Sequence, residues 1–232
     1  MSDTNSSRVV YSEAIEDFLK TAYLLQQEQE RVPTSVLSEA LGITAPSTTE
    51  MAKKLAKAKL VLHEPYRGIR LTAAGERVAL EIIRNHRLLE LFLVQALGYT
   101  WDEVHEEAER LEHSISERMA QRIAEYLGDP RYDPHGDPIP DSEGQIPLRD
   151  LISLAEWPLG EPGMVARLRD QSSDMLRYLE EKGLVVGAQV RVLNRDPFEG
   201  PLTLMVEQQE CIVGAGVAQY VFISSSRDSK MS

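Results

Sequence analysis

A short helix, a tight turn, a second helix and a basic hairpin follow one another between residues 35 and 72, and no other feature constrains the fold as strongly. Gly42 lies where the first helix should end, because glycine readily adopts the left-handed conformation found there. Pro46 fits the first turn of the second helix, which we expect to run to about Leu60. Gly68 lies in the turn between two short strands. Together with a helix predicted at 13–29, this succession is typical of a winged helix-turn-helix.

Small polar residues open the second helix, and basic residues follow in its later turns and in the hairpin. The whole chain of 232 residues has a net charge of −12, yet residues 51–72 hold six basic residues against one acidic residue. Such a local basic surface fits the phosphates of DNA, and a solvated lysine face on a structural domain is the alternative. We expect contacts near base edges from Thr44, Pro46, Ser47 and Glu50. We expect phosphate contacts from Thr49, Lys53, Lys54, Arg67 and Arg70.

The chain from Ala73 to about Leu127 has a helical pattern, interrupted at Gly98. Residues 88–97 are apolar nearly all round their helix, so this helix must be buried. A short helical domain has little interior in which to bury it. A homodimer interface is therefore the economical prediction, and a core within one chain is the alternative.

Imidazoles and carboxylates recur at helical spacing in the same region. Read as one helix, the run from Val104 to His113 places His105, Glu109 and His113 on one stripe, with Glu112 beside them. His86 and Glu90 form a further pair at i, i+4 on the preceding helix. Imidazole nitrogen and carboxylate oxygen are common ligands of divalent transition metals. Spacing alone leaves a metal site and a solvated acidic face as alternatives.

A hydrolytic zinc site is disfavoured by one position of this run. His105 and Glu106 begin like the H-E-x-x-H pattern of zinc proteases, but Glu109 stands where the second histidine should be. The pair of imidazoles that such an enzyme needs is therefore missing.

After residue 127 the helical pattern of the sequence gives way to an irregular segment and then to short strands. Proline and glycine are dense between residues 128 and 147 and predict an irregular arm, in which we expect His135 to face solvent. Short apolar runs separated by glycines then predict a small β-barrel with one helix near residues 173–181. The fold class is therefore mainly α with a small β domain.

Composition limits the setting in which the chain works. Apolar runs of transmembrane length are missing from the sequence, and its first seven residues are polar. A single cysteine, Cys211, excludes an internal disulfide and fits a reducing compartment. We expect a cytoplasmic protein without a membrane partner.

Taken together, these segments resemble the diphtheria toxin repressor family of metal-dependent transcriptional regulators, and in their metal residues the manganese-responsive members. The resemblance covers nearly the whole chain and rests on the order and spacing of its motifs. These motifs are Glu16–Lys20, Ala45–Ser47, Leu71–Gly75, Asn85–Glu90, Val104–Ala108, Leu111–His113, Gly136–Pro140 and Gly183–Gly187. It implies a winged helix-turn-helix DNA-binding domain (1–73), a helical metal-binding and dimerisation domain with a Pro-rich arm (74–147) and an SH3-like, FeoA-like β-barrel (148–232).

The resemblance also implies two metal sites. The primary ligands of the family correspond to Asp17, Glu109, Glu112 and His113, and the ancillary ligands to His86, Glu90 and His105. Manganese-responsive members place carboxylates at the positions of Asp17 and Glu109, as this chain does. Lys20 stands where two-domain manganese regulators have a further glutamate, which disfavours a two-manganese cluster and favours two separate sites. The SH3-like domain of the family adds ancillary ligands; which of Asp170, Gln171, Ser172, Asp174 and Met175 takes this role stays open.

The function implied is a Mn²⁺-dependent regulator that binds operator DNA as a metal-activated homodimer and represses metal-uptake genes. An Fe²⁺-responsive regulator of the same family is the first alternative. A metal-dependent enzyme and a metal-independent winged-helix regulator are the others, although the sequence holds no nucleophile elbow, phosphate loop or cofactor motif for an enzyme.

Overall fold

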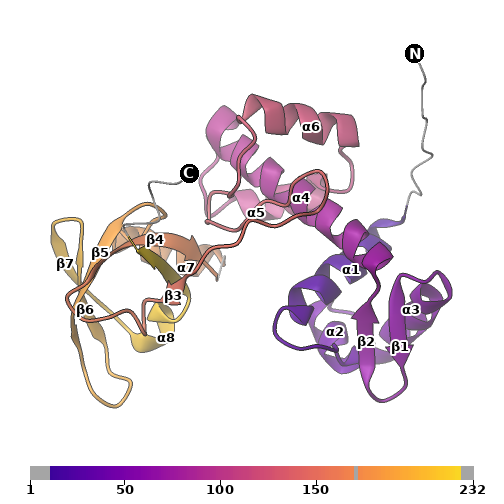
Figure 1. The fold of residues 1–232 in the computed structure, drawn as a ribbon, viewed down its shortest axis with the longest axis horizontal. Helices are drawn as coiled ribbons and strands as arrows, with labels where there is room; N and C mark the ends of the chain where they lie inside the picture. Colours follow the sequence, from indigo (N-terminus) through magenta and orange to yellow (C-terminus); the bar gives the residue numbers. More distant parts are fainter. Residues whose placement is uncertain (1–10, 170–171, 226–232) are drawn as a thin grey trace. The chain divides into compact units, whose positions relative to one another are not determined.

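The computed structural model describes residues 11–169 and 172–225. The chain divides into two compact units, Met1–Arg84 with Ser142–Gly144, and Asn85–Asp141 with Gln145–Ser232. Each unit is described by itself below (Figure 1).

The first unit is a winged helix-turn-helix, as the sequence predicts. Its elements are α1 (Glu13–Gln26), α2 (Thr34–Ala40), α3 (Ala45–Lys57), β1 (Val61–Glu64), β2 (Gly68–Leu71) and the first turns of α4 (Ala73–Leu97). The two strands pair antiparallel, with Val61 opposite Leu71. One apolar core, which includes Phe18, Leu37 and Leu55, joins the helices to the hairpin.

Local signals set the ends of these elements. Gly42 adopts a φ of +64° just after α2, as its predicted place at a helix end requires. Thr44 caps α3, because its hydroxyl accepts a hydrogen bond from the backbone N–H of Ser47, and Pro46 lies in the first turn. Gly68 is needed for a different reason: a Cβ there would lie 2.2 Å from the carbonyl oxygen of Val32. The hairpin therefore packs tightly against the chain in front of α2.

The second unit begins with the later turns of α4, followed by α5 (Val104–Leu111) and α6 (Glu117–Tyr126). Leu88, Leu89 and Leu91 are buried in a core that α5, α6 and Ile139 complete. The apolar helix predicted to need a partner is thus buried to a large extent within its own chain.

The predicted continuous helix from residue 102 to about 127 is wrong in one place. The helix ends at Leu111, and Ser116 caps a new one by accepting a hydrogen bond from the N–H of Met119. The side chains from His105 to His113 therefore do not form one continuous helical stripe, because His113 lies beyond the end of α5. A serine N-cap competes with continued helix at this point.

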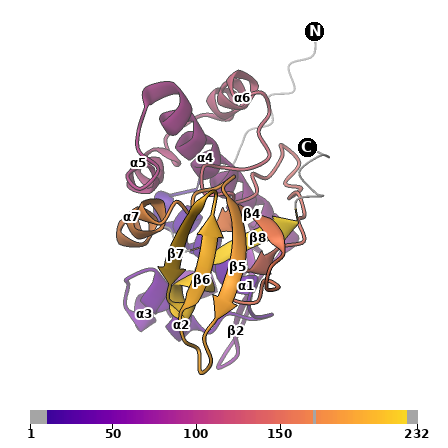
Figure 2. The same cartoon turned by 90° about the vertical axis from the view of Figure 1, so that its left-hand side faces the viewer.

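The C-terminal part of the second unit is a six-stranded antiparallel sheet in the strand order β3-β8-β4-β5-β6-β7. Figure 2 shows β5, β6 and β7 side by side. The elements are β3 (Ile152–Ser153), β4 (Pro162–Leu168), α7 (Ser173–Glu181), β5 (Gln189–Arg195), β6 (Leu202–Val206), β7 (Gln209–Val213), α8 (Ala215–Ala218) and β8 (Val221–Ser225). The sheet and α7 share one core, which confirms the predicted small β domain.

The arm between these two parts is irregular, as predicted, but it is not a solvated linker. Asp133, His135, Asp137 and Ile139 are all buried. The expectation that His135 faces solvent is wrong, since its exposed fraction is 0%. Among the described residues, no helix is both long and apolar enough to cross a membrane.

Candidate metal centre

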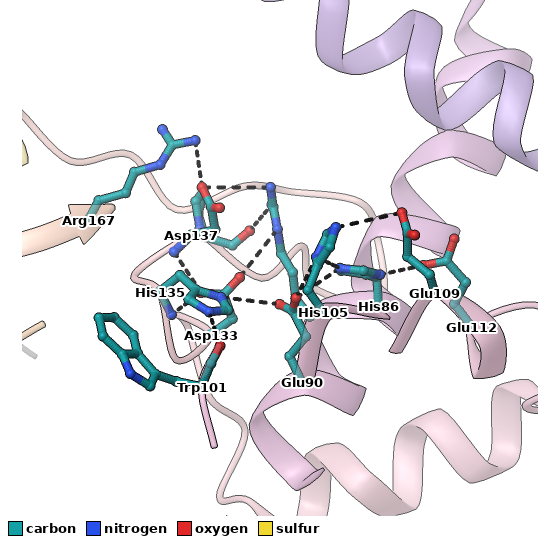
Figure 3. A network of polar contacts seen from close by, with 12 residues as sticks. His86, Glu90, Trp101, His105, Glu109, Glu112, Asp133, His135, Asp137 and Arg167 are labelled. Carbon is teal, nitrogen blue, oxygen red and sulfur yellow. Dashed lines mark hydrogen bonds and ion pairs between the residues drawn. The ribbon is translucent and has the colours of Figure 1, made fainter. Parts of the chain in front are cut away.

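His86 lies at the centre of a buried polar cluster in the second unit (Figure 3). Its Nδ1 is 2.5 Å from Oε2 of Glu112, and its Nε2 is 3.0 Å from Oε1 of Glu90. The same Nε2 is 3.1 Å from Nδ1 of His105. Helix α4 supplies His86 and Glu90 from successive turns of one face, and α5 brings His105 against them. The predicted ancillary set is therefore brought together, with ligand atoms within 4.8 Å of one another.

Three residues predicted for the primary site lie beside this cluster. Oε1 of Glu109 is 3.6 Å from Nε2 of His105, and Oε1 of Glu112 is 3.4 Å from Nε2 of His113. Since the other oxygen of Glu112 contacts His86, the two predicted ligand sets are continuous within the second unit. The fourth predicted residue, Asp17, is half-buried on α1 of the first unit, as is Lys20.

The structure adds two residues that sequence reasoning missed, Asp133 and His135. Together with Glu90 they form a second group whose ligand atoms lie within 4.8 Å of one another. Within the described part of the chain, Oε2 of Glu90, Oδ2 of Asp133 and Nδ1 of His135 are buried and have no hydrogen-bond partner. No periodic signal in the sequence marks them, because residues 133–136 form a turn, closed by a hydrogen bond from the N–H of Gly136 to the carbonyl of Asp133 at 3.1 Å.

Two further contacts fix the orientation of the His135 ring. Nε2 of His135 lies 2.8 Å from the backbone oxygen of Trp101, whose indole stacks on the imidazole at 6.0 Å between ring centres. A proton on Nε2 that is donated to this carbonyl leaves the lone pair of Nδ1 for the cluster. A histidine that ligates a metal commonly donates its other N–H in this way.

The segment from Asp133 to Asp137 is held between the helices and the sheet. Oδ1 of Asp133 accepts hydrogen bonds from the backbone N–H groups of His135 and Asp137, both at 2.9 Å. Asp137 lies 2.5 Å from the guanidinium of Arg167 on β4, and Arg87 on α4 lies 3.9 Å from the same carboxylate. The carbonyl of His135 accepts a hydrogen bond from the N–H of Leu168 at 2.8 Å. Both faces of the segment are thus anchored.

Crowded carboxylates shift the acid–base properties of this cluster. Burial, together with the charges of Asp137 and Glu90, raises the pKa of Asp133 to about 8. Burial disfavours a charged His135, but Glu90 and Asp133 outweigh it and raise the pKa of His135 to about 9. Burial also opposes the ionisation of Glu90, yet its histidine neighbours, His86 first, hold the pKa of Glu90 well below its usual value. Such a site favours an additional positive charge.

The donor set suits a divalent metal ion. It offers imidazole nitrogens and carboxylate oxygens, the ligands of Mn²⁺, Fe²⁺ and Zn²⁺ in proteins. Three buried polar atoms without hydrogen bonds would gain partners in such an ion, which removes the cost of leaving them unpaired. The residues present therefore fit a metal.

Among the residues of the SH3-like domain considered as further ligands, Asp174 and Met175 have neighbours outside the cluster. Asp170 and Gln171 lie outside the described residues. Asp174 pairs with Arg177 at 2.7 Å. Met175 packs against the core of the sheet.

The predicted DNA contacts form an exposed surface on the first unit. Thr49 is half-buried, and the others (Thr44, Pro46, Ser47, Glu50, Lys53, Lys54, Arg67 and Arg70) are exposed. An open hollow at the start of α3 is lined by Ala45, Pro46, Thr49, Glu50 and Lys53. The two hairpin arginines have carboxylate partners of their own: Arg67 lies 3.2 Å from Glu64, and Arg70 lies 3.4 Å from Glu30.

Three family models match successive parts of the chain. Residues 11–69 match the iron dependent repressor, N-terminal DNA binding domain. Residues 72–141 match the iron dependent repressor, metal binding and dimerisation domain, and residues 152–225 match the FeoA domain. Fold and matches together define the class of winged-helix transcriptional regulators that carry a metal-binding domain.

Individual relatives agree with this class. An uncharacterized HTH-type transcriptional regulator of Methanocaldococcus jannaschii is 39% identical over 47% of this chain and 87% of that protein. The HTH-type transcriptional regulator MntR of Bacillus subtilis is 32% identical over 44% of this chain and 72% of that protein. A solved manganese-dependent transcriptional repressor, in complex with manganese, is 40% identical with a TM-score of 0.83, covering 91% of this chain and 99% of that one. The chain belongs to the iron-dependent repressor family, and the resemblance inferred from its motifs is confirmed.

Proposed function

We propose that the chain is a Mn²⁺-dependent transcriptional regulator, which binds operator DNA as a homodimer and represses genes for metal uptake. The observation that carries the proposal is the buried cluster around Glu90, where three polar atoms without hydrogen bonds would gain a partner in a bound cation. The same chain has a winged helix with an exposed basic surface. A metal-binding and a DNA-binding part in one chain are what a metal-responsive regulator requires.

Manganese is favoured by the chemistry of the donors. The cluster holds oxygen and nitrogen donors, and the one cysteine of the chain lies on β7, in the sheet. Hard carboxylate oxygens suit Mn²⁺, whereas thiolate or thioether ligands favour softer ions. The similar solved structure is named a manganese-dependent repressor. Fe²⁺ is the second candidate, since imidazole and carboxylate ligands suit it too.

The residues that would hold metal fall into two sets. The first set has two adjoining positions, one at His86 and His105 and one at Asp133 and His135, which share Glu90. The family resemblance implies a second set of Asp17, Glu109, Glu112 and His113, in which Asp17 belongs to the DNA-binding unit and the others to the second unit. A bound cation would neutralise carboxylates that otherwise repel one another, and would favour the arrangement of the chain that binds it best.

A dimer is supported by apolar side chains that the helical part leaves exposed. Leu97, Met119 and Tyr126 are 60%, 48% and 68% exposed. A second copy that covers them would place two recognition helices on one DNA, and such helices fit major grooves about 34 Å apart. We assign no catalytic residue, because the imidazoles and carboxylates of the cluster are proposed here as metal ligands. A regulator of this kind acts in the cytoplasm, where it meets DNA.

Fluorescence anisotropy tests the proposal with a duplex selected from a random library by the protein in Mn²⁺. We expect DNA affinity to be about 5–150-fold higher with Mn²⁺ than with a chelator, the usual range of coupling between two ligands. His105→Gln should remove most of this difference. Glu106→Gln, an exposed neighbour on the same helix, is the matched control and should keep it.

Equal DNA affinity in metal and chelator would overturn the proposal. Titration with Fe²⁺ without oxygen decides between the two metals. A response to Fe²⁺ at a lower free concentration than to Mn²⁺ would favour an Fe²⁺-responsive regulator.

A further inference from the structure

The wing, which is the β1–β2 hairpin with its turn (residues 61–71), carries an aromatic side chain that the fold does not use. Tyr66 is fully exposed at the tip of the turn and belongs to none of the hydrophobic clusters of the described residues. Its φ of +65° lies in the left-handed region, which is uncommon for a bulky residue and costs conformational free energy. Folding gains no packing in return, so this residue is a candidate for a role in binding.

The turn that carries Tyr66 is firmly held at its base. The N–H of Arg67 donates to the carbonyl of Glu64 at 3.1 Å and closes the turn. The carboxylate of Glu64 is paired with Arg31 at 2.5 Å, which fixes β1 to the chain in front of α2. On the other strand, Gly68 packs directly against Val32. The backbone that carries Tyr66 is therefore held in place before binding, which limits the entropy lost to the ordering of the side chain.

The surroundings of Tyr66 indicate what this partner is. Arg67 and Arg70 lie on the same hairpin and are exposed, and α3, whose face should enter the major groove, packs against β1. A hairpin beside a helix in the major groove meets the neighbouring backbone and the minor groove beyond it. A phenol ring can pack on the sugar walls of that groove, and its hydroxyl can donate to the N3 of adenine or the O2 of thymine.

We propose that Tyr66 enters the minor groove next to the sequence read by α3, and that it discriminates A·T from G·C pairs there. The proposal rests on the DNA-binding function proposed above. The discrimination follows from the 2-amino group of guanine, which occupies the minor groove where A·T pairs show acceptors alone. Tyr66 would thus extend the recognised sequence beyond the contacts predicted for α3.

Duplexes that differ in their flanking pairs test the proposal, with Mn²⁺ in every sample. The selected site is flanked by A·T, G·C or inosine·cytosine pairs; inosine lacks the 2-amino group, so its pair resembles A·T in the minor groove and G·C in the major groove. We expect the wild-type protein to bind the A·T and inosine flanks alike, and the G·C flank about 5–10-fold more weakly. Tyr66→Asn should abolish this preference, and asparagine tolerates the left-handed backbone of the turn.

Phe198→Asn is the matched control. Phe198 is also fully exposed at the tip of a turn, with a φ of +59°, but lies in the second unit between β5 and β6. This variant should keep the flank preference of the wild type. Tyr66→Asn should also keep the wild-type dependence of affinity on salt, because no charge is removed.

Two results would overturn the inference while leaving the proposed function intact. In the first, Tyr66→Asn keeps the preference of the wild type. In the second, Tyr66→Asn loses affinity equally on all three flanks, which would place the ring on the backbone alone. Failure of the wild-type protein to bind any selected duplex in Mn²⁺ would overturn both.

Discussion

The DNA-facing surface of the first unit and the cluster around Glu90 are built in opposite ways. The surface uses exposed residues that are close in sequence, between Thr44 and Arg70, and each keeps its place by local helix or hairpin geometry. The cluster uses buried residues from α4, α5 and the arm, as far apart as His86 and His135. An exposed surface tolerates changes one residue at a time, whereas a buried cluster has to be satisfied as a whole.

Loss of Glu90 should have the largest effect, because both groups of the buried cluster contain its carboxylate. Glu90→Gln keeps the shape of the side chain but removes its charge. We expect Mn²⁺ affinity to fall by more than the roughly 10–100-fold that loss of an outer-shell partner of a metal typically costs. Isothermal titration calorimetry measures this directly. Glu125→Gln, which changes an exposed residue of α6, is the control. An unchanged isotherm for Glu90→Gln would show that the buried cluster tolerates the loss of one member, as the exposed surface does.

An intermediate effect is expected for Asp133→Asn, which should change how the stability of the metal-free protein depends on pH. Without metal, the pKa of Asp133 is raised to about 8 and that of His135 to about 9. Unfolded, these groups titrate near 3.9 and 6.5. Both raised values make the metal-free protein lose stability as pH rises through about 6.5–8.5, because the folded state then holds protons that the unfolded state has released.

Thermal unfolding between pH 6.5 and 8.5 checks this linkage. We expect the midpoint of the metal-free wild type to fall with rising pH, and that of Asp133→Asn to fall less. Mn²⁺ should raise the midpoint more at the higher pH, where its ligands have lost their protons. A metal-free midpoint that rises with pH in this range would contradict the assignment of raised pKa values.

The smallest effect is expected on the exposed surface. Glu30 pairs with Arg70 of the wing, so Glu30→Gln should release Arg70 towards phosphate. Exposed ion pairs are worth at most about 1 kcal/mol, so DNA affinity should rise about 2–3-fold. Anisotropy titration of DNA measures the change. Glu39→Gln, an exposed residue of α2, makes the same change of charge; an equal gain in that variant would show that overall charge, not the ion pair, is responsible.

The sequence was a good guide wherever local chemistry determines structure. Gly42 and Pro46 mark the ends of helices by their own conformational preferences, and α7 occupies the predicted residues 173–181. His86 and Glu90 were also within reach, because pairs at i, i+4 on one helix share a face whatever packs against it. The family resemblance, and not spacing, joined His105 to them.

The sequence failed where tertiary contacts decide. Proline and glycine around His135 predict a solvated arm, but Trp101, Arg87 and Arg167 hold that arm in place from three other parts of the second unit. The end of α5 at Leu111 was missed for a local reason, since the helical pattern of charges runs on through the cap at Ser116. Burial of Asp133 could not be foreseen, because it depends on which side of the arm meets α4.

Glu90 presents one carboxylate oxygen to His86 and His105 and the other to His135. Ions bound in the two groups would share this one side chain, so the affinity of either position would depend on occupancy of the other, and the dependence would be reciprocal. Filling one position orients the carboxylate for the other, while repulsion between the cations opposes it. A single glutamate would thereby govern the cooperativity of the response to metal, and hence the width of the concentration range over which the protein switches.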